Sequence, residues 1–557
     1  MGIFRPKILS TLKGYGKGKL LSDVVAGVIV AIIALPLSIA LAIASGVSPE
    51  RGIYTAIVAG FVIALLGGSR VNISGPTAAF ATIVAGVVAQ HGMSSLVLAT
   101  LMAGILLILM GICRMGALIK YVPYTITTGF TAGIAVTIAI GQLKDFFGLT
   151  FAPGTNAVET LEKVEAIGHS IDTFNWQALL VGLIGLAILI VWPKLKYVCK
   201  IPGSLVAVIV GVLLVKLLPL DVFTIGDLFS ISRDLPPFTV PEFDFDTVRA
   251  VLPSAFTIAI LAALESLLSC VVSDGMIGDK HDSNTELIAQ GAGNICSALF
   301  GGIPATGAIA RTAANVKNGG RSPVSGIVHA IVLLLVLVLL MPCAAWIPMP
   351  IIAAILLMVA YNMSEWRHFV GICKTAPRSD TLVLVLTFLL TVIFDLVVAI
   401  AVGMAVAVLL FMKRMADTAH VRPWTMADEH SESDGGRLKD IPLHTAVFDL
   451  DGPMFFASSD KFADFPMKAG DRVMILRMHN VPSIDATAAR NLDALLRVCE
   501  ARGVYLILTH VNEQPLSMLK KSGFYDALGA EHFMPNVSDA LAFAREYVSA
   551  EKETVNA

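Results

Sequence analysis

Charged residues are scarce in this chain of 557 residues: Asp, Glu, Lys and Arg together make up only 15% of it, whereas hydrophobic residues make up 56%. Soluble globular domains carry about a quarter charged residues. The composition therefore excludes a soluble globular protein and indicates a chain that crosses a membrane many times. The formal net charge of -2 indicates no particular partner, because the loops and the tail set its sign.

Motifs of enzymes and metalloproteins are also missing. The seven cysteines are scattered singly, without a CxxC pair, which argues against a metal site or a disulfide framework. The sequence has no GxxxxGK[ST] phosphate loop and no recognisable nucleophile–base pair. We therefore expect no enzyme activity, no cofactor, no metal and no nucleic-acid partner.

Long apolar runs fill the chain from residue 21 to residue 416 and predict a polytopic α-helical membrane domain with about 14 segments. Five basic residues in the N-terminal segment, residues 1–20, place that segment in the cytoplasm of a bacterial inner-membrane protein. The first run is too long for a cleaved signal peptide. The expected segments are 21–44, 53–67, 76–90, 95–113, 121–141, 176–192, 201–219, 251–272, 284–299, 305–317, 324–346, 349–361, 380–394 and 396–414.

The segment at 305–317 is too short to cross a bilayer, which takes about 20 apolar residues. Gly301 and Gly302 suit extended or left-handed backbone, and Pro304 is tolerated in a first helical turn. The pattern predicts a half-helix that starts near Ala305. Arg311 then lies in its first or second turn, where a cation opposes the helix macrodipole. This placement is favourable if a negative charge binds at the same spot.

The stretch from Val71 to Gly86 repeats this arrangement. Its Ser-Gly-Pro-Thr sequence, residues 74–77, corresponds to Gly-Ile-Pro-Ala at 302–305. The two stretches are seven segments apart, an odd number, so the second half must be inverted relative to the first. Paired interrupted segments of this kind indicate a transporter's substrate site near the membrane midplane. The alternative is two unrelated Gly-Pro kinks.

Glu265 is a lone carboxylate within an apolar segment. Burying it in the charged state costs several kcal/mol, so it is paired, protonated or beside water. We favour a coupling site for a proton or another cation. The alternative is a structural partner for Arg311 or for helix ends.

Other polar residues in the spans receive structural interpretations. Gln290 and Asn294 are expected to join neighbouring helices. Ser283 and Glu286 fit a capping box at the start of their segment. His329 is interpreted as a buried histidine with satisfied hydrogen bonds rather than as a proton relay.

Four motifs in order, VSPERGIYTA, SGPTAAFA, SDGMIGDKHDSNTELIAQGAGN and GGIPATGAIARTAAN, resemble the SulP family of anion transporters, solute carrier family 26 in animals. The resemblance implies seven-plus-seven inverted repeats, a core domain that moves against a gate domain, and an anion held between the third and tenth spans. Leu37 departs from a glutamine that many members carry, which removes one polar contact. The substrate-binding residues expected from the motifs are Ser74, Gly75, Thr77, Ala78, Ala308, Ile309, Ala310 and Arg311.

Glu265 and Ser269 are the expected coupling residues. Sodium-coupled bicarbonate members resemble this stretch but carry aspartate in place of Glu265, and a glutamate suits a proton. The sequence around Glu265 is most similar to that of bacterial proton-coupled dicarboxylate transporters. We therefore expect a secondary active, proton-coupled carrier of C4-dicarboxylates such as succinate, fumarate or aspartate, working by alternating access. The alternatives are a sulfate or bicarbonate transporter coupled to protons or sodium, an anion channel of the same architecture, and a membrane-embedded regulator.

The tail has a different composition. Residues 417–440 are polar and indicate a linker. Residues 441–557 alternate strand-like and helical stretches, which predicts a small α/β domain that resembles a cytoplasmic STAS domain. Ala486 follows Asp485 where a phosphorylated serine follows in related antagonists, which argues against that switch. We expect Asp485 to lie at a helix N-terminus and the domain to serve packing, partner docking or formation of a homodimer.

Overall fold

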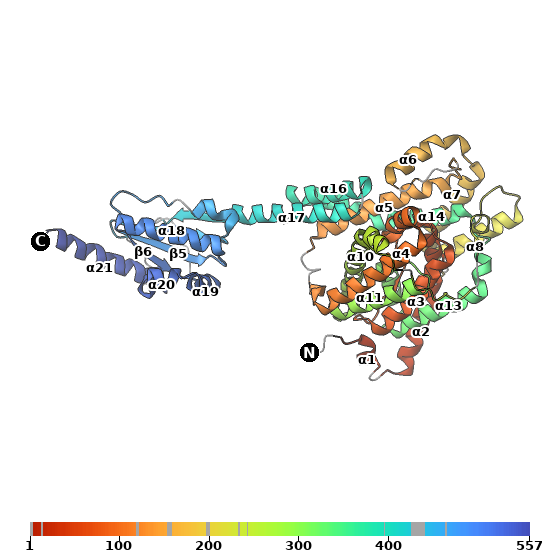
Figure 1. The fold of residues 1–557 in the computed structure, drawn as a ribbon, viewed down its shortest axis with the longest axis horizontal. Coiled ribbons are helices and arrows are strands. Elements are labelled where there is room, and N and C mark those ends of the chain that lie inside the picture. The colour runs from red at the N-terminus through yellow and green to blue at the C-terminus, as the bar shows by residue number, and fades with distance from the viewer. Residues whose placement is uncertain are drawn as a thin grey trace. The chain divides into compact units, whose positions relative to one another are not determined.

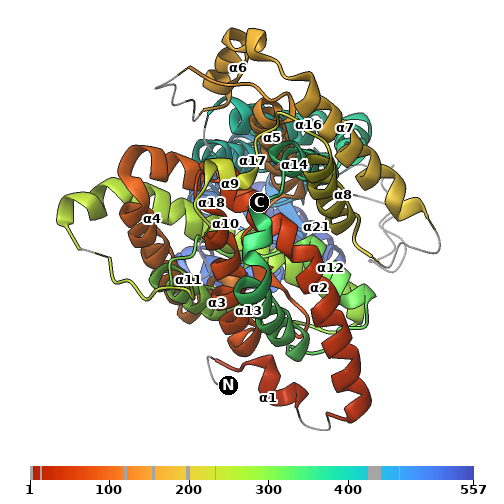
Figure 2. The ribbon, with the colours of Figure 1, turned by 90° about the vertical axis from the view of Figure 1, so that its right-hand side faces the viewer.

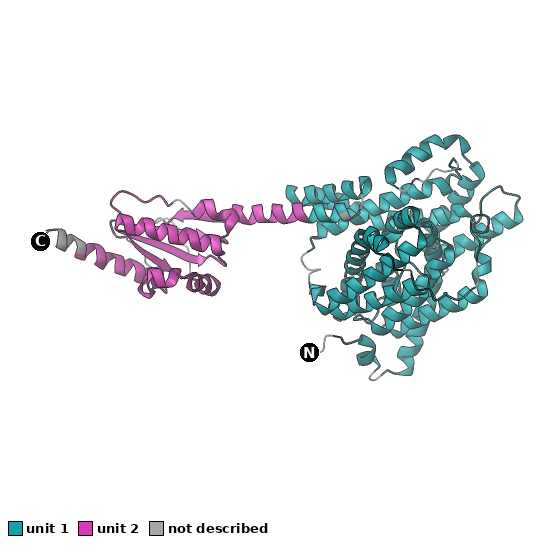
Figure 3. Cartoon of the chain, viewed as in Figure 1, with its two compact units in different colours: residues 1–404 teal, residues 405–557 magenta. Residues whose placement is uncertain are grey.

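The computed structural model describes residues 4–12, 15–117, 122–152, 157, 159–195, 201–231, 234–241, 243–394, 396–424, 441–462 and 465–556. The chain divides into two compact units, residues 1–404 and 405–557 (Figure 3). Within the described residues, 9 helices are long and apolar enough to cross a membrane. Residues 425–440, most of the expected linker, lie outside the described part of the chain.

Every expected apolar segment lies on a helix. The two segments expected at 76–90 and 95–113 share α4, which is interrupted at Gly92 by a φ of 80°. The other helices of unit 1 are short: α1 (Lys7–Thr11), α6 (Thr160–His169), α9 (Ile225–Leu228) and α15 (Trp366–Thr375). The helices on the expected segments are α2 (Lys17–Ala44), α3 (Pro49–Leu66), α4 (Ala81–Ile112), α5 (Tyr124–Phe146), α7 (Trp176–Val191), α8 (Gly203–Leu217), α10 (Phe245–Ile277), α11 (Ser283–Leu299), α12 (Ile309–Lys317), α13 (Val324–Ala344), α14 (Met349–Ser364), α16 (Arg378–Ile393) and α17 (Leu396–Thr418).

The helices of unit 1 pack as two groups. The core group contains α2, α3, α4, α10, α11, α12 and α13, and the gate group contains α5, α7, α8, α14 and α16. Figures 1 and 2 both show α5, α14 and α16 lying together, away from α3, α11 and α13. Gly129 and Gly133 of α5 allow close approach, because a Cβ there would lie 2.7 Å from the Leu384 carbonyl oxygen and 2.6 Å from Thr391 Cβ.

Two short strands pair inside the core group, and we call this pair the crossing. β1 (Ser74–Gly75) pairs antiparallel with β2 (Thr306–Gly307). A 3₁₀ turn, Ala78–Phe80, leads from β1 into α4, and α12 follows β2 directly. The predicted start of the second half-helix near Ala305 is therefore wrong, because β1 holds Thr306 and Gly307 extended and the helix begins at Ile309.

Side chains of α11 hold this crossing in place. The Asn294 side-chain amide accepts from Ala305 N at 2.8 Å and donates to Ala305 O at 2.9 Å. Gln290 Nε2 donates to Ser74 Oγ at 3.0 Å. The prediction that both residues join neighbouring helices is wrong, because Gln290 binds β1 and Asn294 binds Ala305, the residue just before β2.

Glu286 has a different role from the one predicted. Its carboxylate is fully buried and accepts from the backbone amides of Gly68 and Ser69, at 2.9 and 3.2 Å, and from Asn72 Nδ2 at 2.8 Å. The helix is instead capped by Asp282, which accepts from Thr285 N. The predicted capping box is wrong because Glu286 binds the turn that leads from α3 to β1.

Unit 2 contains a five-stranded sheet covered by helices. The strand order is β3 (His420–Pro423), β4 (Thr445–Asp451), β5 (Val473–Asn480), β6 (Tyr505–Thr509) and β7 (Phe533–Met534), and only the β3–β4 pair is antiparallel. β3 lies within the expected linker. Asp485 caps a helix as predicted, because it accepts from Ala488 N. The helices are α18 (Ala486–Arg502), α19 (Glu513–Lys521), α20 (Phe524–Leu528) and α21 (Val537–Asn556).

Candidate anion-binding site

A cavity of about 560 Å³ lies where the two half-helices begin, between the core and gate groups. Most of its lining is apolar, and the polar groups are few. The core group contributes Leu37, Leu41, Pro76, Thr77, Ala78, Glu265, Leu268, Val272, Gly307, Ala308, Ile309, Ala310 and Arg311. The gate group and the residue after α14 contribute Tyr124, Thr127, Thr128, Phe130, Thr131, Val359, Asn362, Met363, Ser364 and Glu365.

Arg311 is the cation of this cavity. It lies in the first turn of α12 and is 1% exposed. Its Nη2 atom donates to Pro76 O at 3.2 Å and to Ser38 Oγ at 3.3 Å. Nε and Nη1 have no hydrogen-bond partner among the described residues, and no described carboxylate pairs with the side chain. Because an unpaired buried charge is costly, the site is prepared for a negatively charged ligand.

The helix ends add to this positive potential. The first amides of an α-helix have no acceptor within the helix, and its N-terminus carries a partial positive charge. Ala78 opens the first half-helix, and Ile309 and Ala310 open the second; all three line the cavity. The antiparallel pairing of β1 and β2 makes both helices start beside the same crossing. This geometry suits an anion.

Glu265 lies on α10 and also lines the cavity. Its Oε2 atom accepts from Thr77 Oγ1 at 3.1 Å. One residue further on, Ser266 Oγ accepts from Gly307 N at 3.0 Å and lies 2.6 Å from Thr306 Oγ1. α10 therefore fixes the starts of both half-helices and presents a carboxyl group, with no counter-cation among the described residues, to the same cavity as Arg311.

The structure brings most of the predicted site residues together: Thr77, Ala78, Glu265, Ala308, Ile309, Ala310 and Arg311 line the cavity. Three others lie behind the lining. Ser74 and Gly75 form β1, and a Cβ on Gly75 would lie 2.5 Å from Arg311 Nη1. Ser269 is buried, and its hydroxyl donates to Asn72 Oδ1 at 2.8 Å and lies 3.2 Å from Thr312 Oγ1.

Several residues of the site and of the network behind it were not predicted from the sequence. Asn72 and Thr312 form the network behind β1, where Thr312 Oγ1 accepts from Ile73 N at 3.0 Å. Both residues could have been found as hydrogen-bonding side chains within the two recognised stretches. Thr127, Thr128 and Thr131 bring hydroxyl groups from the gate group. Their signal was a threonine-rich face at helical spacing within an apolar span.

His329 also differs from its interpretation. It is fully buried on α13, and neither ring nitrogen has a hydrogen-bond partner among the described residues. The prediction of a histidine with satisfied hydrogen bonds is therefore wrong.

Two family models match the chain: the sulfate permease family over residues 20–387 and the STAS domain over residues 438–540. The chain belongs to the sulfate permease family. The SulP resemblance is thereby confirmed, and the protein is a multi-pass anion transporter and not an enzyme.

Two relatives in this family cover nearly all of the chain. The putative sulfate transporter YvdB of Bacillus subtilis is 39% identical over 94% of this chain and 97% of its own. The bicarbonate transporter BicA of Picosynechococcus is 30% identical over 87% and 88%. A solved structure of the murine anion transporter Slc26a9 has a TM-score of 0.85 at 19% identity, covering 97% of this chain and 94% of that one, and shows the shared fold.

Proposed function

We propose that this protein is a secondary active carrier that takes up C4-dicarboxylates together with protons. The observation that carries the proposal is the buried, incompletely bonded Arg311 at the start of a half-helix. A carboxylate at this position would accept from the free guanidinium nitrogens and from helix-terminal amides, which are strong charge-assisted hydrogen bonds.

Alternating access would follow from the two helix groups. The anion contacts the core group through Arg311 and the gate group across the cavity, so a movement of one group against the other carries it between the two sides. Tyr124, at the start of α5, and Glu365, after the end of α14, line the cavity. Because the basic N-terminal residues favour a cytoplasmic N-terminus, the start of α5 and the end of α14 would lie on the cytoplasmic side. The cavity would then open to the cytoplasm, as in the inward-facing state of the transport cycle.

The lining supports an extended anion. One end of a C4-dicarboxylate would bind Arg311, and the cavity of about 560 Å³ leaves room for the carbon chain and a second carboxylate near the gate-group threonines. Leu37 and Leu41 would contact the carbon chain. Sulfate and bicarbonate are the alternative substrates, because the named relatives are a putative sulfate transporter and a bicarbonate transporter.

Glu265 would carry the coupling proton. Protonation removes a negative charge from the cavity that the anion enters, so each ligand favours the other. A sodium ion at the same carboxylate is the alternative. The proposal also includes an inner-membrane location, a cytoplasmic STAS domain and a homodimer formed partly through that domain.

The test is uptake of labelled succinate, fumarate, sulfate and bicarbonate into proteoliposomes with and without a pH gradient. Acid-driven accumulation of succinate or fumarate at zero membrane potential is the expected result. Accumulation of sulfate or bicarbonate alone would overturn the substrate class, and uptake that only equilibrates would indicate a channel. No transport of any of these anions would overturn the proposed substrate and indicate an anion outside this set.

A further inference from the structure

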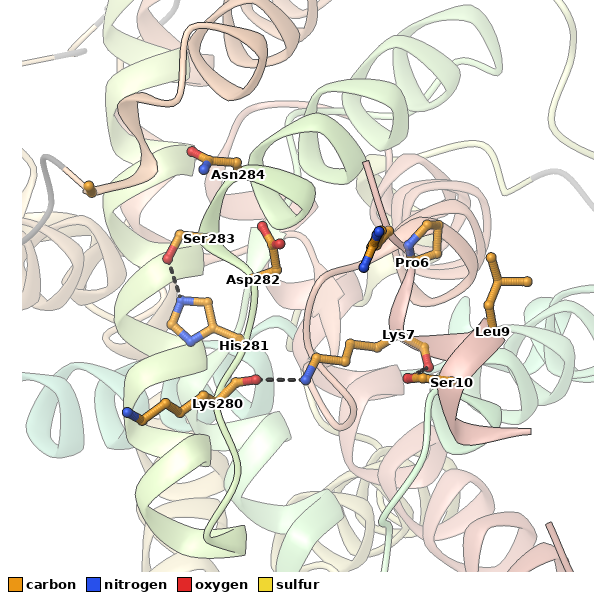
Figure 4. Close-up of a pocket in the computed structure, with 11 residues that line it drawn as sticks. Pro6, Lys7, Leu9, Ser10, Lys280, His281, Asp282, Ser283 and Asn284 are labelled. Carbon is orange, nitrogen blue, oxygen red and sulfur yellow. Dashed lines mark hydrogen bonds between the residues drawn. The ribbon is translucent and has the colours of Figure 1, made fainter. Parts of the chain in front are cut away.

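A second cavity, of about 790 Å³, lies at the N-terminal edge of unit 1 (Figure 4). One wall is the N-terminal segment around α1, and the other is the connection from α10 to α11. It is separate from the anion site, since the two cavities share no lining residue.

The N-terminal segment is fastened to the core group by its backbone and by one lysine. Lys7 N donates to Gly67 O at 2.9 Å, and Arg5 N donates to Thr285 Oγ1 at 3.2 Å. Lys7 Nζ donates to Lys280 O at 2.7 Å, as Figure 4 shows. These contacts hold Arg5 and Lys280 at the same cavity while leaving both side chains exposed.

The charge around this cavity is positive. Lys7 and Arg70 both pair with Asp279, at 3.5 and 2.8 Å. Burial raises the pKa of the Asp279 carboxyl, but the hydrogen bond from Lys280 N and the two cations outweigh it, so the pKa is lowered overall. Asp282 uses one carboxylate oxygen to cap α11. Arg5 and Lys280 have no salt-bridge partner among the described residues and are free to bind an external anion.

Apolar side chains are exposed on the same segment. Leu9 of α1 lines the cavity and is 65% exposed. Leu12, which follows α1, is 49% exposed. The first membrane helix, α2, begins only a few residues later, at Lys17, so this segment lies at the membrane surface. Exposed leucines beside unpaired cations at that level are the pattern of an interfacial segment that binds anionic lipid.

We propose that this cavity binds the phosphate headgroup of an anionic phospholipid. Arg5 and Lys280 contact the phosphate, and Leu9 and Leu12 contact the acyl chains. The lipid lies against one side of the N-terminal segment, and the other side of that segment contacts the turn after α3. Glu286 binds that turn and fixes it to the core group.

The test uses the full chain in detergent, with retention of phosphatidylglycerol and phosphatidylcholine measured by native mass spectrometry over a lipid titration. The wild type is expected to prefer phosphatidylglycerol. Arg5→Gln with Lys280→Gln should weaken that binding roughly 25-fold, because each basic residue near an anionic surface contributes about fivefold. The matched control is Lys520→Gln with Lys521→Gln, two exposed lysines of α19 in unit 2, which should leave the affinity unchanged.

Two further arms separate a lipid from free phosphate. Leu9→Ser with Leu12→Ser should lower phosphatidylglycerol binding, and millimolar inorganic phosphate should not displace the lipid. Arg5→Lys with Lys280→Arg keeps the charges and should keep the preference, which guards against a folding defect. Unchanged phosphatidylglycerol binding in the glutamine variant would overturn the site. Full displacement by phosphate, with no effect of the leucine changes, would overturn the lipid as its ligand.

Discussion

At the scale of single residues, Arg311 has an unusual environment. It is fully buried, yet only one guanidinium nitrogen has hydrogen-bond acceptors there. An arginine that served only the fold would be expected to use its remaining donors on protein groups. We therefore infer that those donors bind the transported anion.

Replacing Arg311 separates binding from folding. Arg311→Met should abolish the rise in melting temperature that the substrate causes, which corresponds to about 2.7 kcal/mol when the anion is present at 100 times its dissociation constant. Without substrate, the variant should melt at or above the wild-type temperature, because an uncompensated buried charge is removed. Thermal unfolding with and without substrate measures both effects. Arg367→Met, at an exposed arginine, is the control, and a normal substrate shift in Arg311→Met would rule out its role.

Gly75 tests the same guanidinium from the other side. A Cβ at Gly75 would lie 2.5 Å from Arg311 Nη1, so Gly75→Ala must displace the cation. Overpacking of this kind costs about 1–3 kcal/mol, and we expect it as a loss of substrate affinity in a binding titration. Gly275→Ala on α10 is the matched control, because a Cβ there meets nothing within 4 Å. Equal affinities of the two variants would contradict the placement of Arg311.

At the scale of elements, the hydrogen bonds that fix the two-stranded crossing decide where the half-helices begin. Gly-Pro pairs and a run shorter than a membrane span made both interruptions predictable. The start at Ile309 was not, because it depends on pairing between residues more than 200 positions apart, Ser74 with Gly307 and Gly75 with Thr306. Glu286 was misassigned for the same reason: a local capping pattern and a distant turn compete for one carboxylate, and sequence spacing shows only the first.

Replacing Asn294 tests how far the crossing depends on the hydrogen bonds of this side chain. Asn294→Ala leaves Ala305 N and Ala305 O without their partner in a buried place. An unsatisfied buried group costs about 1–3 kcal/mol, so we expect a lower melting temperature together with weaker substrate binding. Asn318→Ala is the control, because that amide only bonds Ala314 O one turn back at an exposed position. Similar melting temperatures for the two variants would show that the crossing is held by other contacts.

At the scale of the whole molecule, the residues of the anion cavity all lie in one of the two units. Both half-helices, Arg311 and Glu265 belong to residues 1–404, whereas the sheet of unit 2 starts at β3. The composition change near residue 417 predicts a separate tail, whereas the two units divide at residue 404, within α17. The sequence pattern did not indicate that β3 forms within the expected linker.

Truncation tests the division. A chain that ends at Asp417 keeps almost all of α17 and removes β3 and everything after it. We expect it to bind the anion with wild-type affinity, since every lining residue precedes that point. The comparison requires truncated protein that size-exclusion chromatography shows to be monodisperse. Loss of binding in such a preparation would show that the site depends on the tail.

We propose that Arg311 and Glu265 bind an anion and a proton in one cavity. The decisive experiment is succinate uptake into proteoliposomes at zero potential under an inward proton gradient, with the wild type and Glu265→Gln measured side by side. The glutamine variant mimics the protonated carboxyl, so it should still exchange labelled for unlabelled succinate. We expect acid-driven accumulation by the wild type and none by Glu265→Gln. Full acid-driven accumulation by Glu265→Gln would contradict it, because the proton would then travel by another group.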